Sequence, residues 1–163
     1  MATFTLTYFP LAGNGQASRF ALAAVGANWK NNLVEKTQWP AVKASGAAPF
    51  GQLPFLEVHE ANGETWKIAE SHSLVRFICS RFHKVAASER ENALADSLIE
   101  RLYDMRNALS KAAPFGDPER LAKSQAWFDA EFPAFNQQLD KYLEASKGPY
   151  FFGNTFTAAD VLW

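Results

Sequence analysis

The sequence has one cysteine, no cluster of basic residues and no long hydrophobic run. A single cysteine, Cys79, cannot form an internal disulfide and excludes a Cys-x-x-Cys redox or zinc motif. The 16 Lys and Arg nearly balance the 17 Asp and Glu, so neither nucleic acid nor a membrane surface is expected as a partner. The longest apolar stretch, residues 20–27, is far shorter than the ~20 residues that span a membrane, and the first residues lack a signal-peptide pattern. These absences predict a cytoplasmic protein.

What the sequence does contain is enough apolar material for a packed core. Of its 163 residues, 48% are hydrophobic, 14% aromatic and 20% charged. This composition excludes a disordered chain, a coiled coil and a collagen-like fibre. The length fits one domain or two small ones that fold without metal or disulfide crosslinks.

Residues 1–82 carry the pattern of an α/β domain. Apolar and polar side chains alternate over residues 3–8, which predicts a strand. After Gln16, helical spacing places Ala17, Phe20, Ala21 and Ala24 on one side of a helix that stops at Gly26. Asn62-Gly63 separates two further apolar runs and indicates a hairpin with a type I′ turn. Ser71 is predicted to cap the next helix. The expected order is strand 3–8, helix 16–25, strand 29–35, helical turn 40–45, strands 55–59 and 65–69, and a helix from 71 to 82.

Residues 88–163 show helical patterns only, after a linker at 83–87. A capping box, Ser88-Glu89-Arg90-Glu91, starts one long helix. Asp117 as N-cap starts a second, which is expected to kink at Pro133 and to run to about residue 146. The sequence therefore predicts an all-helical second domain.

A second capping box lies near the end of the chain. Thr157 and Asp160 form the box, and Phe156 and Val161 stand at the positions of a hydrophobic staple. The sequence ends six residues after Thr157, at Trp163. We therefore expect the helical domain to be incomplete at its end.

Three short motifs lie where α/β folds place ligands. Tyr8 ends the first strand, beside a loop and a helix N-terminus. Leu53-Pro54 begins a later strand, where a cis bond would leave backbone groups facing outward. Glu70-Ser71 lies at a helix N-terminus, whose free amides suit a carboxylate. Each motif also has a plain structural interpretation, as a strand aromatic, a tight turn and a helix cap.

Other candidate groups indicate no chemistry. His59, His72 and His83 lack the spacing of a catalytic triad or a metal site, so no metal is predicted. Cys79 is interpreted as a packing residue within a helix. The run Gly13-Asn14-Gly15 is only a weak match to a dinucleotide-binding fingerprint.

Taken in order, these motifs resemble the cytosolic glutathione transferases of the tyrosine type, and the sigma class in particular. The resemblance implies a thioredoxin-like N-terminal domain, a helical C-terminal domain and an enzyme that adds glutathione to small electrophiles. It covers the whole chain and is carried by Tyr8-Phe9-Pro10, Trp39 and Lys43, Phe50-Gly51-Gln52-Leu53-Pro54, Glu70-Ser71, Asp104, and the box from Thr157 to Asp160.

The resemblance also assigns roles in binding glutathione. Tyr8 would donate a hydrogen bond to the glutathione sulfur and so favour its thiolate. Leu53, ahead of Pro54, would pair its backbone with the cysteinyl segment as an added strand does. The other contacts would come from Gln52 and Ser71 at the γ-glutamyl end, and from Trp39 and Lys43 at the glycine carboxylate, and Glu70 is also implied to bind glutathione.

A homodimer is implied as well. Asp104 matches an acidic residue that reaches the γ-glutamyl amine in the partner subunit. Phe50 matches an aromatic key that inserts into the partner, and its alternative is an ordinary core side chain. The electrophile is expected between the Leu11-Ala12 loop and the helix that carries Met105 and Ala108.

Two positions depart from the tyrosine-type pattern. Glu70 stands where such members usually carry Gln, and Asn14 stands where many carry Arg. Three functions remain open from the sequence: conjugation of glutathione to electrophiles, isomerisation of a prostaglandin-type peroxide, and a non-catalytic role as a ligand-binding or crystallin-like structural protein.

Overall fold

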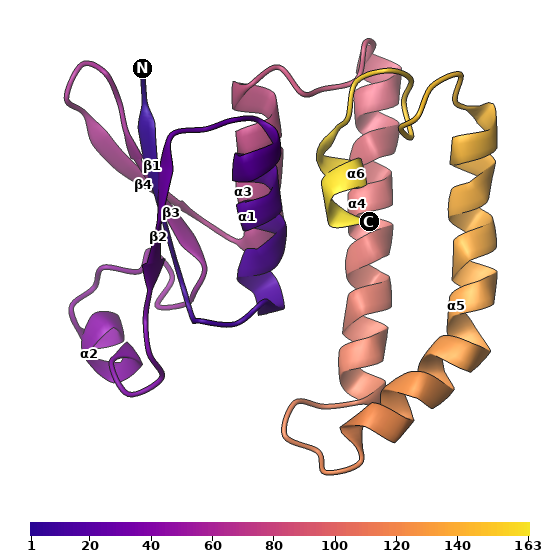
Figure 1. Ribbon diagram of the computed structural model, residues 1–163, viewed down its shortest axis with the longest axis horizontal. Coiled ribbons are helices and arrows are strands. Elements are labelled where there is room, and N and C mark those ends of the chain that lie inside the picture. Colours follow the sequence, from indigo (N-terminus) through magenta and orange to yellow (C-terminus); the bar gives the residue numbers. More distant parts are fainter. The chain divides into compact units, whose positions relative to one another are not determined.

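A four-stranded mixed sheet forms the centre of the N-terminal part of the chain (Figure 1). In the computed structural model, which describes residues 1–163, the chain divides into two units, residues 1–84 and 85–163. In the sheet, β1 runs parallel to β2 and antiparallel to β3, which pairs antiparallel with β4. The strands are β1 (Thr3–Tyr8), β2 (Trp29–Leu33), β3 (Phe55–His59) and β4 (Thr65–Ala69), in the order β2-β1-β3-β4.

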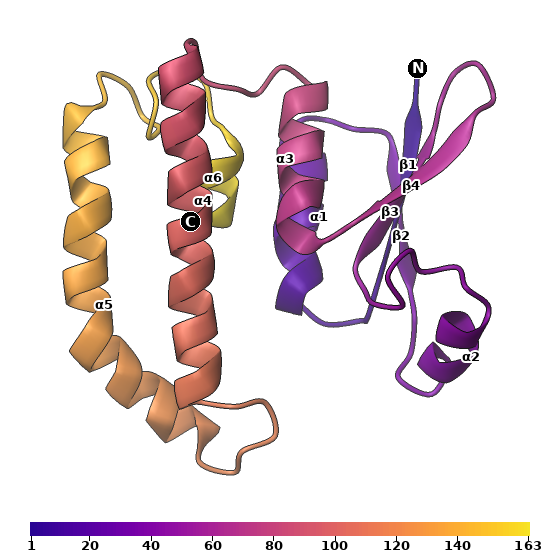
Figure 2. The same ribbon diagram turned by 180° about the vertical axis from the view of Figure 1, so that it is seen from behind.

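The alternation in β1 decides which face of the sheet is buried. Phe4, Leu6 and Tyr8 point to one side and are buried together with Leu56 and Val58 of β3. Helices α1 (Gln16–Ala24) and α3 (Ser71–Arg81) cover this side, and Figures 1 and 2 show both on the same face. The first unit therefore has the layered α/β architecture that its sequence predicts.

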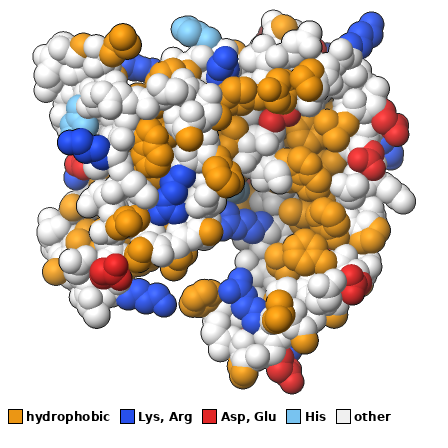
Figure 3. Space-filling view, viewed as in Figure 1, with side chains coloured by type: hydrophobic (Ala, Val, Ile, Leu, Met, Phe, Trp, Pro, Cys, Tyr) orange, Lys and Arg blue, Asp and Glu red, His pale blue; other side chains and the backbone are white.

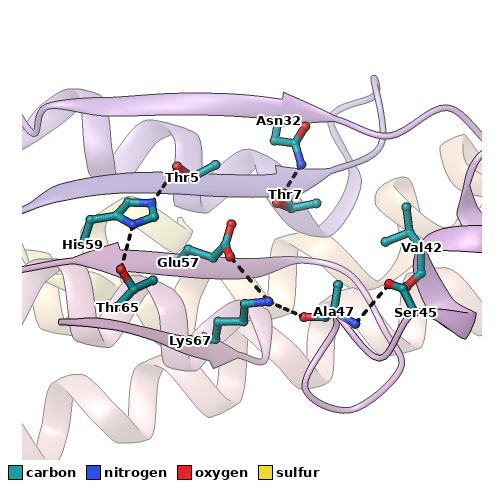
Figure 4. Close-up of polar contacts among 10 residues, drawn as sticks. All are labelled: Thr5, Thr7, Asn32, Val42, Ser45, Ala47, Glu57, His59, Thr65 and Lys67. Atoms are coloured by element: carbon teal, nitrogen blue, oxygen red, sulfur yellow. Dashed lines mark hydrogen bonds and ion pairs between the residues drawn. The ribbon is translucent and has the colours of Figure 1, made fainter. Parts of the chain in front are cut away.

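The opposite face of the sheet is polar (Figure 4). His59 links two strands there, with its ring nitrogens 3.2 Å from the hydroxyl oxygens of Thr5 and Thr65. The Lys67 ammonium lies 3.4 Å from the Glu57 carboxylate and donates to the carbonyl oxygen of Ala47 at 2.9 Å. Helix α2 (Trp39–Ala44) lies on the side of the sheet away from α1 and α3.

The hairpin between β3 and β4 differs from the expected type I′ turn. Its loop has three residues, because Glu60 pairs with Glu64 through a 2.8 Å hydrogen bond from the Glu60 N–H. Gly63 has a φ of +89°, whereas Asn62 is not among the residues with positive φ. The Gly63 N–H donates to the Glu60 carbonyl oxygen at 3.0 Å, so the loop is a type I turn closed by a glycine bulge. The prediction of a hairpin is correct, but the predicted turn type is wrong.

Helix α1 ends as predicted but buries a different face. Gly26 has a φ of +67°, and the Ala27 N–H donates to the Leu22 carbonyl oxygen, which completes a Schellman motif. The buried residues of α1 are Ser18, Ala21 and Leu22, whereas Phe20 is 57% exposed. Helical spacing alone therefore places Phe20 on the wrong side.

The second unit contains three helices: α4 (Glu89–Ala112), α5 (Arg120–Ala145) and α6 (Ala158–Leu162). The capping box at Ser88 is present, and Pro133 lies inside α5, which is visibly bent in Figure 1. Helix α5 begins later than predicted, because the Asp117 carboxylate accepts a hydrogen bond from the Glu119 N–H and forms a turn instead of an N-cap.

The core of the second unit lies where α4 meets α5 and α6. Leu98, Ile99 and Leu102 of α4 and Leu139 of α5 are buried. Figure 3 shows hydrophobic side chains gathered between α5 and α6, where Phe128, Phe132, Phe135 and Trp163 form a series of ring contacts. None of the helices is both long and apolar enough to cross a lipid bilayer.

Candidate functional site

Tyr8 is held at the end of β1 by a hydrogen bond to its hydroxyl oxygen. Its side chain is 6% exposed. The backbone N–H of Asn14 donates to the phenol oxygen at 2.9 Å. No protein acceptor takes the phenol proton, so this hydroxyl can still donate a hydrogen bond outward.

Two glycines allow the loop to approach the Tyr8 ring. A Cβ on Gly15 would lie 2.4 Å from the Tyr8 Cδ1 atom, and a Cβ on Gly13 would lie 2.6 Å from the phenol oxygen. Gly15 has an ordinary φ of −84°, so the ring rather than the backbone angle requires glycine there. The Gly13-Asn14-Gly15 run is therefore explained by the packing of Tyr8 and not by a dinucleotide.

A small pocket brings together five of the residues that the sequence analysis singled out. Gln52, Leu53 and Pro54 come from the segment before β3, and Glu70 and Ser71 from the start of α3. The peptide between Leu53 and Pro54 is cis, as predicted. Together with Asn14 and Ala69, these residues line a pocket of about 50 Å³.

The polar side chains that line this pocket have no partner within the protein. No hydrogen bond or ion pair within the protein involves the side chains of Gln52, Glu70 or Ser71. The first helical hydrogen bond of α3 runs from the Leu74 N–H to the Glu70 carbonyl oxygen at 2.9 Å, so Glu70 occupies the N-cap. The expectation that Ser71 caps α3 is therefore wrong, because the N-cap is Glu70.

Glu70 also has an unusual backbone conformation. Its φ is +72°, a region that residues other than glycine rarely adopt and that costs about 1–3 kcal/mol. Such strain persists where the surrounding structure enforces it, and it is concentrated at ligand sites. The carboxylate and the free amides at the start of α3 are thereby held next to the Leu53–Pro54 segment.

Trp39 and Lys43 of α2 lie beside the same segment. Trp39 packs with Leu53 against a buried cluster of Ala48, Phe55 and Ala69. An aromatic series connects it to the first strand, with ring centroids 5.5 Å apart for Tyr8 and Phe9 and 5.9 Å for Phe9 and Trp39. The side chain of Lys43 passes close to Gly51, since a Cβ on that glycine would lie 3.5 Å from the Lys43 Cε atom.

The remaining predicted residues lie elsewhere. Asp104, Met105 and Ala108 line a groove of about 300 Å³ within the second unit, together with Trp127, Glu131 and Phe135 of α5. Leu11 and Ala12 are exposed in the loop before α1. An electrophile pocket formed by Leu11, Ala12, Met105 and Ala108 stays a prediction.

Phe50 is 67% exposed. Its interpretation as an ordinary core side chain is therefore wrong. Cys79, by contrast, is buried in α3 as a packing residue should be. No group of three or more His, Cys, Asp and Glu side chains is arranged to hold a metal ion.

Sequence reasoning missed two contributors to the environment of Tyr8. The Asn14 donor is a backbone N–H, which almost every residue type has, so the identity of residue 14 does not predict it. Arg19 of α1 places its guanidinium carbon 5.6 Å from the centre of the Tyr8 ring. An arginine one turn into the helix after the first strand is the signal that could have identified it.

Comparisons with known sequences point to one family. Residues 103–163 match the model of a glutathione S-transferase C-terminal domain. The chain is 36% identical to "Probable glutathione S-transferase 5" of Caenorhabditis elegans over 99% of its own length and 77% of that protein. It is 26% identical to human "Hematopoietic prostaglandin D synthase" over 100% of its length and 77% of that protein.

Solved structures give the same result. A nematode-specific glutathione S-transferase of C. elegans superposes with a TM-score of 0.74 at 32% identity, over 97% of this chain and 76% of that one. A structure described as monomeric Na-GST-3 of the hookworm Necator americanus superposes with a TM-score of 0.82 at 27% identity, over 98% and 77%.

Proposed function

This chain belongs to the glutathione S-transferase family, and from this premise we propose that its first unit binds glutathione and that Tyr8 stabilises the thiolate that attacks a small electrophile. The observation that carries this proposal is the uncommitted Tyr8 hydroxyl. Its oxygen already accepts the Asn14 N–H, while its proton has no acceptor in the protein.

The chemistry requires a shift in the ionisation of the bound thiol. A free thiol has a pKa of about 8.5 and is mostly protonated at neutral pH. A hydrogen bond donated to the charged form lowers that pKa, and each unit corresponds to about 1.36 kcal/mol. The thiol proton leaves to solvent, and the thiolate sulfur forms a bond to the electrophilic carbon. With an aryl halide the carbon–halogen bond breaks and halide ion leaves to solvent, and Tyr8 keeps its own proton throughout.

The two ends of glutathione would bind to different groups. The carboxylate of the γ-glutamyl end suits the Ser71 hydroxyl and the free amides at the start of α3, and its amine suits the Glu70 carboxylate. Gln52 adds an amide beside them, and the Leu53 backbone offers strand-like hydrogen bonds to the cysteinyl segment. The Lys43 ammonium and Trp39 indole would hold the glycine carboxylate, which places the sulfur toward Tyr8.

The test compares Tyr8→Phe with the matched control Tyr142→Phe. Tyr8→Phe removes only the hydroxyl, and one preorganised donor is worth about 3 kcal/mol, so we expect turnover with an aryl halide to fall about 10- to 1,000-fold. Calorimetry should show nearly unchanged glutathione binding. Tyr142 lies in the second unit, packed against Phe152, and its phenylalanine variant should keep full activity.

Unchanged conjugation rates in Tyr8→Phe would contradict the proposal. Glutathione binding without any turnover in the unmodified protein would favour a ligand-binding or structural role instead. A second candidate function is favoured by the similarity to the prostaglandin D synthase: glutathione-dependent isomerisation of a prostaglandin-type peroxide. Assaying that isomerisation beside aryl halide conjugation distinguishes the two activities.

A homodimer is part of this proposal. Phe50 and Asp104 are both exposed, in the first and second unit respectively, and both are free to contact a second copy of the chain. An exposed phenylalanine at a loop is a suitable anchor for an interface, since aromatic side chains supply much of the binding energy in such contacts.

A further inference from the structure

Arg19 connects the loop beside Tyr8 to the first turn of α1. One terminal nitrogen, NH2, donates to the Phe9 carbonyl oxygen at 3.0 Å. The other, NH1, donates to the Leu11 carbonyl oxygen at 2.7 Å and to the Gln16 side-chain oxygen at 3.3 Å. A single guanidinium thus fixes both carbonyl groups at the beginning of the loop to helix α1.

The same loop carries the donor that reaches Tyr8. Between the carbonyls that Arg19 holds and the start of α1, the chain makes a short 3₁₀ turn, Gly13–Gly15, and Asn14 in that turn donates its N–H to the phenol oxygen. The guanidinium also lies over the Tyr8 ring, 5.6 Å from its centre. Arg19 therefore touches the loop and the ring whose relative position sets this 2.9 Å hydrogen bond.

The Asn14 hydrogen bond matters for the direction in which Tyr8 donates. When the phenol oxygen accepts an N–H on one side, rotation of its O–H bond about the C–O bond is restricted. The hydroxyl proton therefore points away from Asn14. Hydrogen bonds in series also polarise one another, which makes the phenol a stronger donor to a thiolate. Both effects require the loop to stay in place.

We propose that Arg19 is a positioning residue for the thiolate-stabilising hydrogen bond of Tyr8, and that it acts through the loop and not through its charge. This inference rests on the proposed function, since it names what keeps Tyr8 effective in that function. Arg19 lines none of the pocket formed by Gln52, Leu53, Pro54, Glu70 and Ser71, so glutathione binding itself should depend on it little.

The shape of the Arg19 side chain allows an experiment to distinguish its hydrogen bonds from its charge. The fork of arginine reaches two carbonyl groups at once, whereas lysine carries the same charge on a single nitrogen. The Nε atom of Arg19 is buried without a hydrogen-bond partner, so the two terminal nitrogens make all of its hydrogen bonds. Arg19→Lys should therefore keep the charge but lose the simultaneous hold on Phe9 and Leu11.

The experiment measures the ionisation of bound glutathione in Arg19→Ala, Arg19→Lys, Tyr8→Phe and the unmodified chain. The ultraviolet absorption of the thiolate is titrated against pH, and kcat and the glutathione KM are measured at each pH. We expect both Arg19 variants to raise the pKa of the bound thiol by about half to one unit, which leaves about three to ten times less thiolate at pH values below that pKa. The loss should appear in kcat, leave KM nearly unchanged and recover as the pH rises.

A matched control is Arg81→Ala. Arg81 lies in α3 of the same unit and pairs with Glu60 at the surface, and it touches neither the loop nor Tyr8. Its variant should change the thermal stability but leave the thiol titration unchanged.

Each result decides between the inference and its alternatives. Full rescue by Arg19→Lys would show a through-space effect of charge and overturn the inference, as would an unshifted thiol in Arg19→Ala. If Arg19→Ala does not fold, the titration of Arg19→Lys alone decides in the same way. If Tyr8→Phe itself leaves the thiol unshifted, the proposed function fails; if only the Arg19 variants leave it unshifted, this inference alone fails.

Discussion

At the scale of single residues, the position of Tyr8 depends on what its neighbours lack. The ring is buried against a loop in which two glycines leave the space for it, and a Cβ at Gly15 would overlap the ring atoms Cδ1 and Cγ at 2.4 and 2.6 Å. Real Cβ atoms do not approach other atoms so closely, so any side chain at residue 15 has to displace the ring or the loop. Both movements disturb the hydrogen bond from Asn14 to the phenol oxygen.

Gly15→Ala should therefore impair both stability and catalysis. Overpacking costs about 1–3 kcal/mol of the free energy of unfolding, and we expect turnover to fall at least tenfold because the hydroxyl moves. Urea unfolding and kcat measurement check the two effects. Gly63→Ala is the control, since Gly63 has a φ of +89° and open space around it, so alanine there costs stability but leaves kcat unchanged. A normal kcat in Gly15→Ala would show that the loop tolerates the displacement.

At the scale of elements, the start of α6 is fixed by one carboxylate. The Asp160 Oδ2 atom accepts hydrogen bonds from the N–H and the hydroxyl of Thr157, at 2.7 and 2.8 Å. The Oδ1 atom accepts the N–H of Phe151 at 2.9 Å. Phe151 and Thr157 are both buried, so these donors have no access to water. The capping box of Thr157 and Asp160 thus also connects α6 to the segment that follows α5.

Asp160→Asn tests this connection with little change of shape. An amide offers one acceptor oxygen where the carboxylate uses two, so at least one buried donor loses its partner. We expect a loss of about 1.5–3 kcal/mol in the free energy of unfolding, measured by urea denaturation. Ser88→Ala, at the exposed capping box of α4, is the comparison and should cost about 1 kcal/mol. Equal losses in the two variants would mean that the contact with Phe151 adds nothing.

The helices and strands that show a clear hydrophobic pattern were predictable from the sequence. The turn type of the hairpin and the buried face of α1 depend on tertiary contacts and were not. The strands at residues 55–59 and 65–69 have the predicted bounds, because each is an apolar run and the Asn62-Gly63 turn signal separates the two. The hairpin turn was not predictable, since Asn-Gly fits both a two-residue loop and the observed bulge in which only Gly63 has a positive φ. Phe20 was misplaced for a similar reason, because spacing does not say which stripe of α1 meets the sheet.

The same distinction applies to the site. Tyr8, Leu53-Pro54 and Glu70-Ser71 could be found from the sequence because they stand at the ends of predicted elements. The Asn14 N–H could not, since a backbone donor is common to almost every residue type. Nor could the contact of Arg19 with the loop, which depends on how α1 packs on β1. Sequence patterns therefore locate side chains at the ends of elements more readily than the groups that hold those side chains in place.

At the scale of the whole molecule, each unit carries a surface ion pair in which the pKa of the carboxyl is lowered. The Arg81 guanidinium, hydrogen-bonded to Glu60, lowers the pKa of that carboxyl below its ordinary value. Lys123 does the same to the pKa of Asp117. A carboxyl with a lowered pKa stabilises the folded chain at pH values above its unfolded pKa, and the stabilisation is lost as the pH falls through the folded one.

The double variant Glu60→Gln, Asp117→Asn should therefore be less stable than the unmodified chain at neutral pH and equally stable in acid. Both carboxyls ionise near pH 4 in an unfolded chain, so the difference in Tm should shrink below about pH 4 and vanish near pH 2. Calorimetric scans from pH 2 to 7 measure it. A difference that stays constant across this range would show that the two ion pairs contribute nothing through their charge.

The proposed dimer predicts that two defective chains restore each other. If Asp104 of one subunit completes the glutathione site that contains Tyr8 of the other, then a heterodimer of Tyr8→Phe and Asp104→Ala has one site with both native residues. Random assortment of an equal mixture gives native sites at about a quarter of all positions, so unfolding and refolding the mixture should restore about a quarter of the normal turnover at low glutathione. Refolding each variant alone gives the baseline. Phe50→Ala should weaken the dimer and raise the fraction of monomer seen in sedimentation, since truncating an interface aromatic often costs more than 1 kcal/mol of binding free energy. Activity equal to the mean of the two refolded parents would show that each chain builds its site alone.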